Sequence, residues 1–312
     1  MPRRSPIQWP NNARIAITPA VAFEIWPDDI GTAPSLNRSH RAPLPGNARF
    51  NKDLSVITDR QYGERVGVYR MLDVFASEGV NTTFFINGMT AEVHPDTTRE
   101  IKAAGHEIAT ESYIHDYNYM KDREQERIDL EKTVEAVRKA TGEAPQGFLS
   151  MGIQPTENTP ELVAEIGYLY WADLQHDELP YTLRVNGRNL AALSYAFPLN
   201  DYTSYSEMSR SPRELFQIWK DTFDWLYEEG ERGAPKMMLW GLHPFLTGRP
   251  FRAVLLREFI RYAKGHPGVW FARCIDVANW WLERYQDAHV EDWPNCLHMT
   301  QPPVSSRFAL MG

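Results

Sequence analysis

The sequence predicts an α/β fold, namely a distorted (β/α) barrel of about seven strands. Short apolar runs alternate with amphipathic stretches from Ala13 to about residue 285, which is the pattern of a parallel sheet with helical crossovers. Several of the expected helices end in a glycine, such as Gly79. The chain has 312 residues, 43% of them hydrophobic, which is enough for one sizeable core.

Each expected strand is a short apolar or β-branched run, and each expected helix has apolar residues spaced three and four apart. Strands are expected at 13–23, 80–88, 106–112, 147–152, 168–174, 190–199, 236–244 and 268–274. Helices are expected at 63–79, 94–105, 122–142, 159–167, 211–230, 252–265 and 276–285. Strand and helix therefore follow each other along nearly the whole chain.

Residues 1–285 are predicted to form a single catalytic barrel domain, and residues 286–312 a C-terminal extension. The barrel would carry a long loop at 26–60, and loops of this length usually have a function or pack on a neighbour. The extension has an apolar end, FALM, that would pack across its own barrel or onto another subunit, with disorder as the alternative. We therefore expect a homo-oligomer, either a dimer or a tetramer.

The composition limits the partners of the chain. Its net charge is -8 and no run rich in lysine or arginine occurs, so a nucleic-acid partner is not expected. We find no apolar stretch long enough to span a membrane and no signal-peptide pattern, so we expect a soluble cytoplasmic protein with no membrane partner. Cys274 and Cys296 are far apart and are expected to be reduced.

Charged side chains follow several predicted strands at the point where each strand ends. Glu24 ends the first strand, Glu111 and His115 follow the third, and Asp173 and His243 end two later ones. The carboxyl ends of the strands form the active-site face of a (β/α) barrel, so these side chains should converge.

Their chemistry gives each a candidate role. Glu111 and His115, in the pattern E-x-x-x-H, are types that bind divalent metals, although a hydrogen-bonded pair without metal is the alternative. His243 suits general acid–base catalysis. Glu24 is a candidate base or metal-bridging carboxylate, because a buried carboxylate is costly unless it is paired or functional. Asp28 and Asp29 lie just beyond and could also reach the site.

At the family level, three segments carry a resemblance: GHEIATESYIH, GEAPQGFLSMGIQPTENTPELVAEIGYLYWADLQHDELPY and GLHPFLTGRPFRAVLLREFIRY. On these segments, residues 13–285 resemble the polysaccharide deacetylase superfamily, carbohydrate esterase family four. The branch that looks nearest is the cytoplasmic one with allantoinase-like and cyclic-imidase-like enzymes. This resemblance implies a barrel that hydrolyses carbon–nitrogen bonds.

The resemblance also exposes departures from the deacetylase pattern. Two metal-binding histidines of that pattern fall at Glu111 and His115, and its metal-binding aspartate falls at Ile25, which cannot bind a metal. Its arginine falls at Leu149, whereas its base and its late histidine fall at Glu24 and His243. Zinc, or next manganese, is the metal that the resemblance implies, with a metal-independent mechanism as the alternative.

The sequence therefore predicts a hydrolase of a non-peptide carbon–nitrogen bond in a small, possibly cyclic, amide, ureide or imide. Glu24 and His243 would be the base and the acid, and Asp173 would orient the substrate or tune His243. Ser150, Trp171 and Asp201 are the predicted substrate-binding residues. The alternatives are a metal-dependent N-deacetylase of an amino sugar or oligosaccharide, and a catalytically decayed barrel that only binds.

Overall fold

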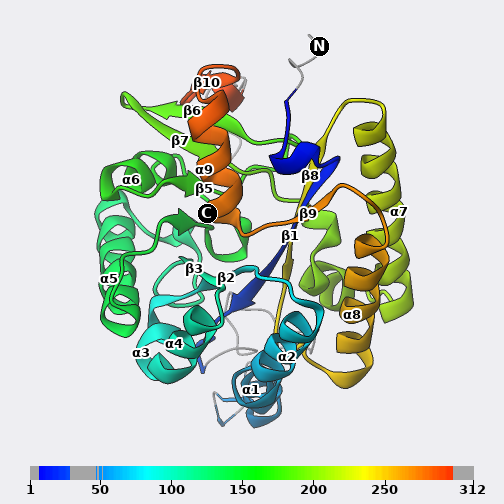
Figure 1. Cartoon of the computed structure of the whole chain (residues 1–312). Helices are drawn as coiled ribbons and strands as arrows, with labels where there is room; N and C mark the ends of the chain where they lie inside the picture. Colours follow the sequence, from blue (N-terminus) through cyan, green and yellow to red (C-terminus); the bar gives the residue numbers. More distant parts are fainter. Residues whose placement is uncertain (1–6, 29–46, 48, 51, 298–312) are drawn as a thin grey trace, which may run out of the picture.

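The computed structural model describes residues 7–28, 47, 49, 50 and 52–297. Seven parallel strands form the wall of a barrel, and helices surround it (Figure 1). The prediction of a barrel of about seven strands is therefore confirmed. In spatial order these strands are β8 (Lys236–Leu242), β1 (Ile15–Phe23), β2 (Thr83–Ile86), β3 (Glu107–Thr110), β4 (Gly147–Phe148), β5 (Tyr170–Trp171) and β7 (Arg188–Ala192).

The two ends of this seven-strand series come close to each other. β7 does not pair with β8, but the chain beyond β7 does reach it, because the Ala196 N–H donates to the Leu239 carbonyl at 2.7 Å. The Met237 N–H likewise donates to the Glu178 carbonyl at 2.9 Å. These two backbone hydrogen bonds nearly close the sheet, which gives the distorted shape.

Three further strands extend the sheet. β6 (Tyr181–Val185) pairs antiparallel with β7, β10 (Val290–Asp292) pairs with β6, and β9 (Val269–Phe271) pairs with β1. We did not predict β6 or β10. The signal for β6 was Asn186–Gly187, which both have positive φ and form the two-residue turn of a β-hairpin.

Most of the helices lie where their periodicity placed them. In chain order they are α1 (Leu54–Tyr62), α2 (Val68–Glu78), α3 (Gly88–Val93), α4 (Pro95–Ala103), α5 (Arg123–Thr141), α6 (Thr159–Ile166), α7 (Pro212–Glu231), α8 (Pro250–Lys264) and α9 (Cys274–Tyr285). None of the helices in the described ranges is long and apolar enough to cross a membrane.

The predicted loop at 26–60 is wrong at its C-terminal end. Helix α1 begins at Leu54, where the Asp53 carboxylate caps it by accepting from the N–H groups of Ser55 and Val56. Most of the preceding loop, including Asp29, lies outside the described residues, as does the end of the C-terminal extension at 298–312.

Most strands are shorter than predicted, and three of them end well before their predicted C-terminal ends. The predicted strands at 147–152, 168–174 and 190–199 end at Phe148, Trp171 and Ala192. The polar side chains beyond these points hydrogen-bond within loops at the barrel mouth instead of continuing the ladder. The sequence thus located the strands but missed where the site loops begin.

The period of two along each strand decides what faces the barrel interior. On β1, Ala16 and Ala20 pack in the interior core, whereas Ile15, Ile17 and Val21 pack outward against the helices. The same alternation turns the residues after the strand ends inward. Small residues on the inward face leave the space in which the cavity described next is formed.

Candidate active site

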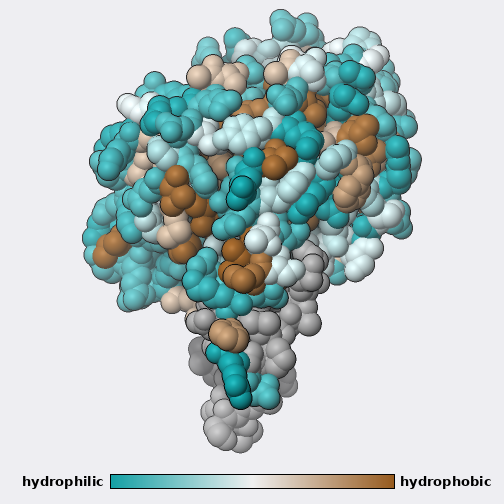
Figure 2. Space-filling model, turned by 90° about the horizontal axis from the view of Figure 1, so that it is seen from below, coloured by the Kyte–Doolittle hydropathy of each residue, from teal (hydrophilic) through white to brown (hydrophobic). Residues whose placement is uncertain are grey.

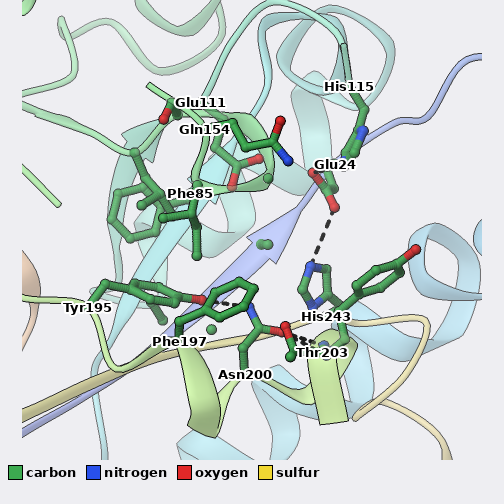
Figure 3. A pocket seen from close by; sticks show the side chains of 18 of the residues that line it. Glu24, Phe85, Glu111, His115, Gln154, Tyr195, Phe197, Asn200, Thr203 and His243 are labelled. Atoms are coloured by element: carbon green, nitrogen blue, oxygen red, sulfur yellow. Dashed lines mark hydrogen bonds and ion pairs between the residues drawn. The ribbon is translucent and has the colours of Figure 1, made fainter. Parts of the chain in front are cut away.

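A cavity of about 350 Å³ lies at the carboxyl ends of the barrel strands (Figure 3). The inward positions of β1 and β8 supply Ala22, Glu24, Gly241 and His243. The other lining residues come from β2 and the loops beyond the strands: Trp26, Phe85, Glu111, His115, Tyr117, Tyr119, Leu149, Ser150, Gly152, Ile153, Gln154, Tyr195, Phe197, Asn200, Tyr202, Thr203 and Glu207, with Ala20 at the floor.

Glu24 lies at the centre of a carboxylate–histidine cluster, which we define as Glu24, Glu111, His115 and His243. Its Oε2 lies 3.6 Å from His115 Nε2, and its Oε1 lies 3.5 Å from His243 Nε2. It also hydrogen-bonds to Glu111, and Trp26 Nε1 donates to Oε1 at 3.1 Å. The structure therefore brings together four of the residues that the sequence predicted.

The two carboxyl groups of the cluster share one negative charge. Burial raises the pKa of Glu111 well above its ordinary value, and the neighbouring Glu24 raises it further. Burial also raises the pKa of Glu24, but His243 and the hydrogen bond from Glu111 offset part of that rise. The pKa of Glu111 is therefore raised more than that of Glu24, so the shared proton favours Glu111 and the charge favours Glu24. Glu111 Oε2 is buried and has no hydrogen-bond partner among the described residues.

His243 is held by Asp201. Its Nδ1 lies 2.6 Å from Asp201 Oδ1, and Asp201 Oδ2 accepts from the His243 backbone N–H at 2.9 Å and from the Thr247 hydroxyl. Burial alone would lower the pKa of His243, but Asp201 and Glu24 together raise it above its ordinary value. The hydrogen bond from Nδ1 to Asp201 therefore directs His243 Nε2 at Glu24, and the charge of Asp201 favours the protonated imidazole.

His115 has the opposite protonation preference. Burial lowers its pKa well below the ordinary value, and the nearby Arg60 guanidinium lowers it further. Trp26 stacks on the His115 ring with 3.3 Å between centroids, and Arg60 packs over the other ring of this stack, 3.7 Å from the Trp26 centroid. The pKa values of the two imidazoles are therefore shifted in opposite directions, and of the two His243 is the better proton donor.

Three of the predicted site residues, Asp173, Trp171 and Asp201, do not line the cavity but support residues that do. Asp173 accepts from the Ser150 N–H at 2.9 Å and the Ser150 hydroxyl at 2.6 Å, and from Trp171 Nε1. Asp173 and Trp171 do not line the cavity, whereas Ser150 does. The residue that tunes His243 is therefore Asp201, not Asp173. Asp201 is buried behind His243 and does not line the cavity, so the structure places it as the partner of His243.

The donor set does not fit a metal centre with three ligands. Among the described residues, no group of three or more His, Cys, Asp or Glu side chains is arranged to hold a metal ion. Ile25, which the resemblance aligns with the metal-binding aspartate, has no ligating atom in its side chain, and the Glu111 carboxyl is engaged in a hydrogen bond with Glu24. Asp28 does not contribute, because it is exposed and pairs with Lys52 at 2.5 Å.

Sequence reasoning missed Arg60, Trp26, Tyr195 and Gln154. Arg60 fell in a predicted loop, although it follows Val56 at the helical spacing of four residues. Tyr195 lies against the backbone of β8, where a Cβ at Gly241 would come within 2.0 Å of its hydroxyl. A glycine on the inward face of a strand indicates that another group packs closely against the backbone there, and this was the available sequence signal for Tyr195.

The face around the cavity mouth is mainly hydrophilic. Figure 2 looks onto this face and shows separate apolar patches among hydrophilic side chains outside the grey atoms. Tyr119 and Met120 are more than half exposed, and Tyr119 stacks on Tyr117 with 5.3 Å between ring centroids. Both tyrosines line the cavity, so an aromatic pair forms part of its rim.

The chain is similar in sequence to known deacetylases. Residues 52–171 match the family model for polysaccharide deacetylase. The chain is 29% identical over 89% of its length to a Schizosaccharomyces pombe protein named as a polysaccharide deacetylase, of which it covers 93%. It is also 25% identical to the peptidoglycan deacetylase of Helicobacter pylori, covering 72% of this chain and 86% of that protein.

Solved structures are similar over the whole barrel. The structure of PuuE allantoinase matches with 32% identity and a TM-score of 0.78, covering 91% of this chain and 98% of that one. A Pseudomonas aeruginosa protein assigned by its name to the polysaccharide deacetylases matches with 34% identity and a TM-score of 0.77, covering 89% of this chain and 94% of that one.

Proposed function

The chain belongs to the polysaccharide deacetylase family, whose members hydrolyse carbon–nitrogen bonds other than peptide bonds, and we propose that it hydrolyses a small uncharged amide such as a cyclic ureide, hydantoin or imide. The observation that carries this proposal is the carboxylate–histidine cluster. It places a base, Glu24, and an acid, His243, 3.5 Å apart in the lining of one small cavity.

The charges at the cavity favour an uncharged substrate. Glu24, Glu111 and Glu207 line it, and no lysine or arginine does so among the described residues. Arg60 is close, but its guanidinium lies over the Trp26 and Phe245 rings, outside the lining. A substrate carboxylate would therefore find no lining cation for a bidentate ion pair. The similarity to PuuE, which is named as an allantoinase, also supports a small uncharged amide as the substrate.

The mechanism requires activated water, a polarised carbonyl and a protonated leaving nitrogen. Glu24 accepts a proton from water as the oxygen attacks the amide carbon, for which its raised pKa is suited. The His115 imidazole is placed to hydrogen-bond the carbonyl oxygen, whereas Glu111, which donates to Glu24, presents its unpartnered Oε2 as an acceptor for a substrate N–H. His243 donates its proton to nitrogen as the C–N bond breaks, and a cyclic imide or hydantoin then opens to one product that carries a carboxylic acid and a neutral amide or urea group.

N-deacetylation of an amino sugar is the second candidate. The stacked Tyr117–Tyr119 pair at the rim favours it, because exposed aromatic rings pack well against apolar faces of sugars. The names of the Schizosaccharomyces pombe and Helicobacter pylori relatives point the same way. The departures at Ile25 and Leu149 weigh against it.

The deciding experiment compares substrates on metal-analysed protein. Hydantoin, allantoin, succinimide and N-acetylglucosamine oligomers are offered before and after chelation, with elemental analysis per chain. We expect turnover of a cyclic amide that changes by less than about twofold after chelation, since the proposed steps use only side chains. Deacetylation of the sugar alone would overturn the substrate proposal, and loss of all turnover with a stoichiometric metal would overturn the metal-independent mechanism.

The remaining expectations, a homo-oligomer and a cytoplasmic location, are proposals that the size of the purified protein in solution and its cellular fractionation would test.

A further inference from the structure

The loop after β4 is held in a strained conformation beside the cavity. Gly152 and Ile153 have φ values of 63° and 56°. The value at Ile153 is unusual because a β-branched side chain clashes with the backbone in the left-handed region. Gly152, Ile153 and the following Gln154 all line the cavity. The strain is therefore located where the loop meets the substrate.

The surrounding contacts fix this conformation. The Ile153 N–H donates to the Ser150 carbonyl at 2.9 Å, and Asp173 holds Ser150 through both its N–H and its hydroxyl. The Ile153 side chain packs against the interior core. Asp173 thus anchors the loop, and the loop conformation fixes the backbone position from which the Gln154 side chain extends.

Gln154 has a free carboxamide aimed into the cavity. Figure 3 shows its side chain extending toward Glu24. No hydrogen bond to its amide exists within the described part of the chain. By contrast, the other lining carboxamide is committed, because Asn200 Nδ2 donates to the Tyr195 hydroxyl and Asn200 Oδ1 accepts from the Tyr202 N–H, each at 2.7 Å.

A carboxamide presents one donor and one acceptor side by side, which matches the C=O and N–H of another amide. The carboxylate–histidine cluster already serves the amide that is cleaved. We propose that Gln154 recognises a second amide group of the substrate and so selects substrates with two amide units, such as hydantoins, ureides and imides, over monoamides. This inference rests on the proposed hydrolysis of small amides and names the feature by which the site chooses among them.

The test compares variants on two matched probes. Hydantoin or succinimide supplies two amide units, and 2-pyrrolidinone, a competitor of similar ring size, supplies one. Gln154→Leu removes both hydrogen bonds, Gln154→Glu keeps an acceptor only, and Gln146→Leu is the control, an exposed glutamine at the opposite end of β4. The readouts are kcat and KM for the two-amide probe and the inhibition constant of 2-pyrrolidinone.

We expect Gln154→Leu to reduce kcat/KM for the two-amide probe by roughly 10- to 100-fold, mainly through KM. The inhibition constant of 2-pyrrolidinone should change by less than about threefold, and Gln146→Leu should behave like the wild type. Equal weakening of both probes, or no change in either, would overturn the role of Gln154 while leaving the proposed function intact. A wild type that turns over no two-amide compound would overturn both.

Discussion

Glu107 and Glu111 are two buried glutamates at the two ends of β3, since Glu107 is its first residue and Glu111 follows its last. They are four residues apart, so the period of two turns both toward the barrel interior, about 13 Å from each other along β3. Glu107 receives hydrogen bonds from the Thr83 and Tyr170 hydroxyls and from the Ile275 N–H. Glu111 shares one proton with Glu24 and leaves an oxygen without a partner in the described chain.

This difference separates a structural from a functional buried acid. Burial raises the pKa of both, that of Glu107 to about 7 despite its three donors. Every oxygen of Glu107 is satisfied within the protein, so the fold itself accounts for that group. Glu111 and its neighbours are incompletely satisfied and face a cavity, which indicates that a ligand completes their interactions.

The largest effect should come from the centre of the cluster. Glu24→Gln keeps the shape of the side chain but removes the base, so kcat should fall by about 10²- to 10⁴-fold. The measurement is steady-state turnover of the substrate found in the panel, with circular dichroism to show that the fold is kept. A variant with more than a tenth of wild-type kcat would exclude Glu24 as the base.

The two glutamates of β3 should then give opposite results when each is changed to glutamine. Glu111→Gln keeps a hydrogen-bond donor but cannot exchange a proton with Glu24, so it should lower kcat by about 10²-fold with little change in unfolding free energy. Glu107→Gln should lower the unfolding free energy by about 1–3 kcal/mol, because its NH₂ group would face a hydrogen-bond donor, with kcat within about threefold of wild type.

Denaturant titration and steady-state kinetics on both variants make this comparison. The pH dependence sharpens it further. Folded Glu107 keeps its proton up to about pH 7, whereas the unfolded chain releases it near pH 4.5, so this group's contribution to stability falls as the pH rises through that window. Glu107→Gln should remove this slope. Equal losses of activity in the two variants would contradict the distinction between them.

The smallest effect should appear in the pH profile of Asp201→Asn. In the wild type, kcat/KM should rise as Glu24 loses its proton and fall as His243 loses its own, each at a pKa above the ordinary value. The neutral amide of this variant would lack the charge that raises the pKa of His243. The alkaline limb should therefore move to lower pH, with a loss of about tenfold at pH 8. An unmoved limb would show that another group is the acid.

The sequence by itself determined the order of strands and helices and the inward placement of the main chemistry. Glu24 and His243 follow apolar strands, and alternation along those strands turns both into the barrel. The same rule places Ile25, which replaces the family's metal ligand, on the opposite side. Local pattern and strand parity are short-range properties, so they can be read from neighbouring residues.

Only the tertiary structure decided which residues support the cluster. Asp201 reaches His243 from 42 positions away, and Arg60 reaches His115 through Trp26, from a helix that lies within the predicted loop. The same holds for Asp173, which anchors Ser150 instead of tuning His243. These pairings depend on how the loops fold back over the barrel mouth. A sequence specifies such long-range contacts only through the complete packing of the chain.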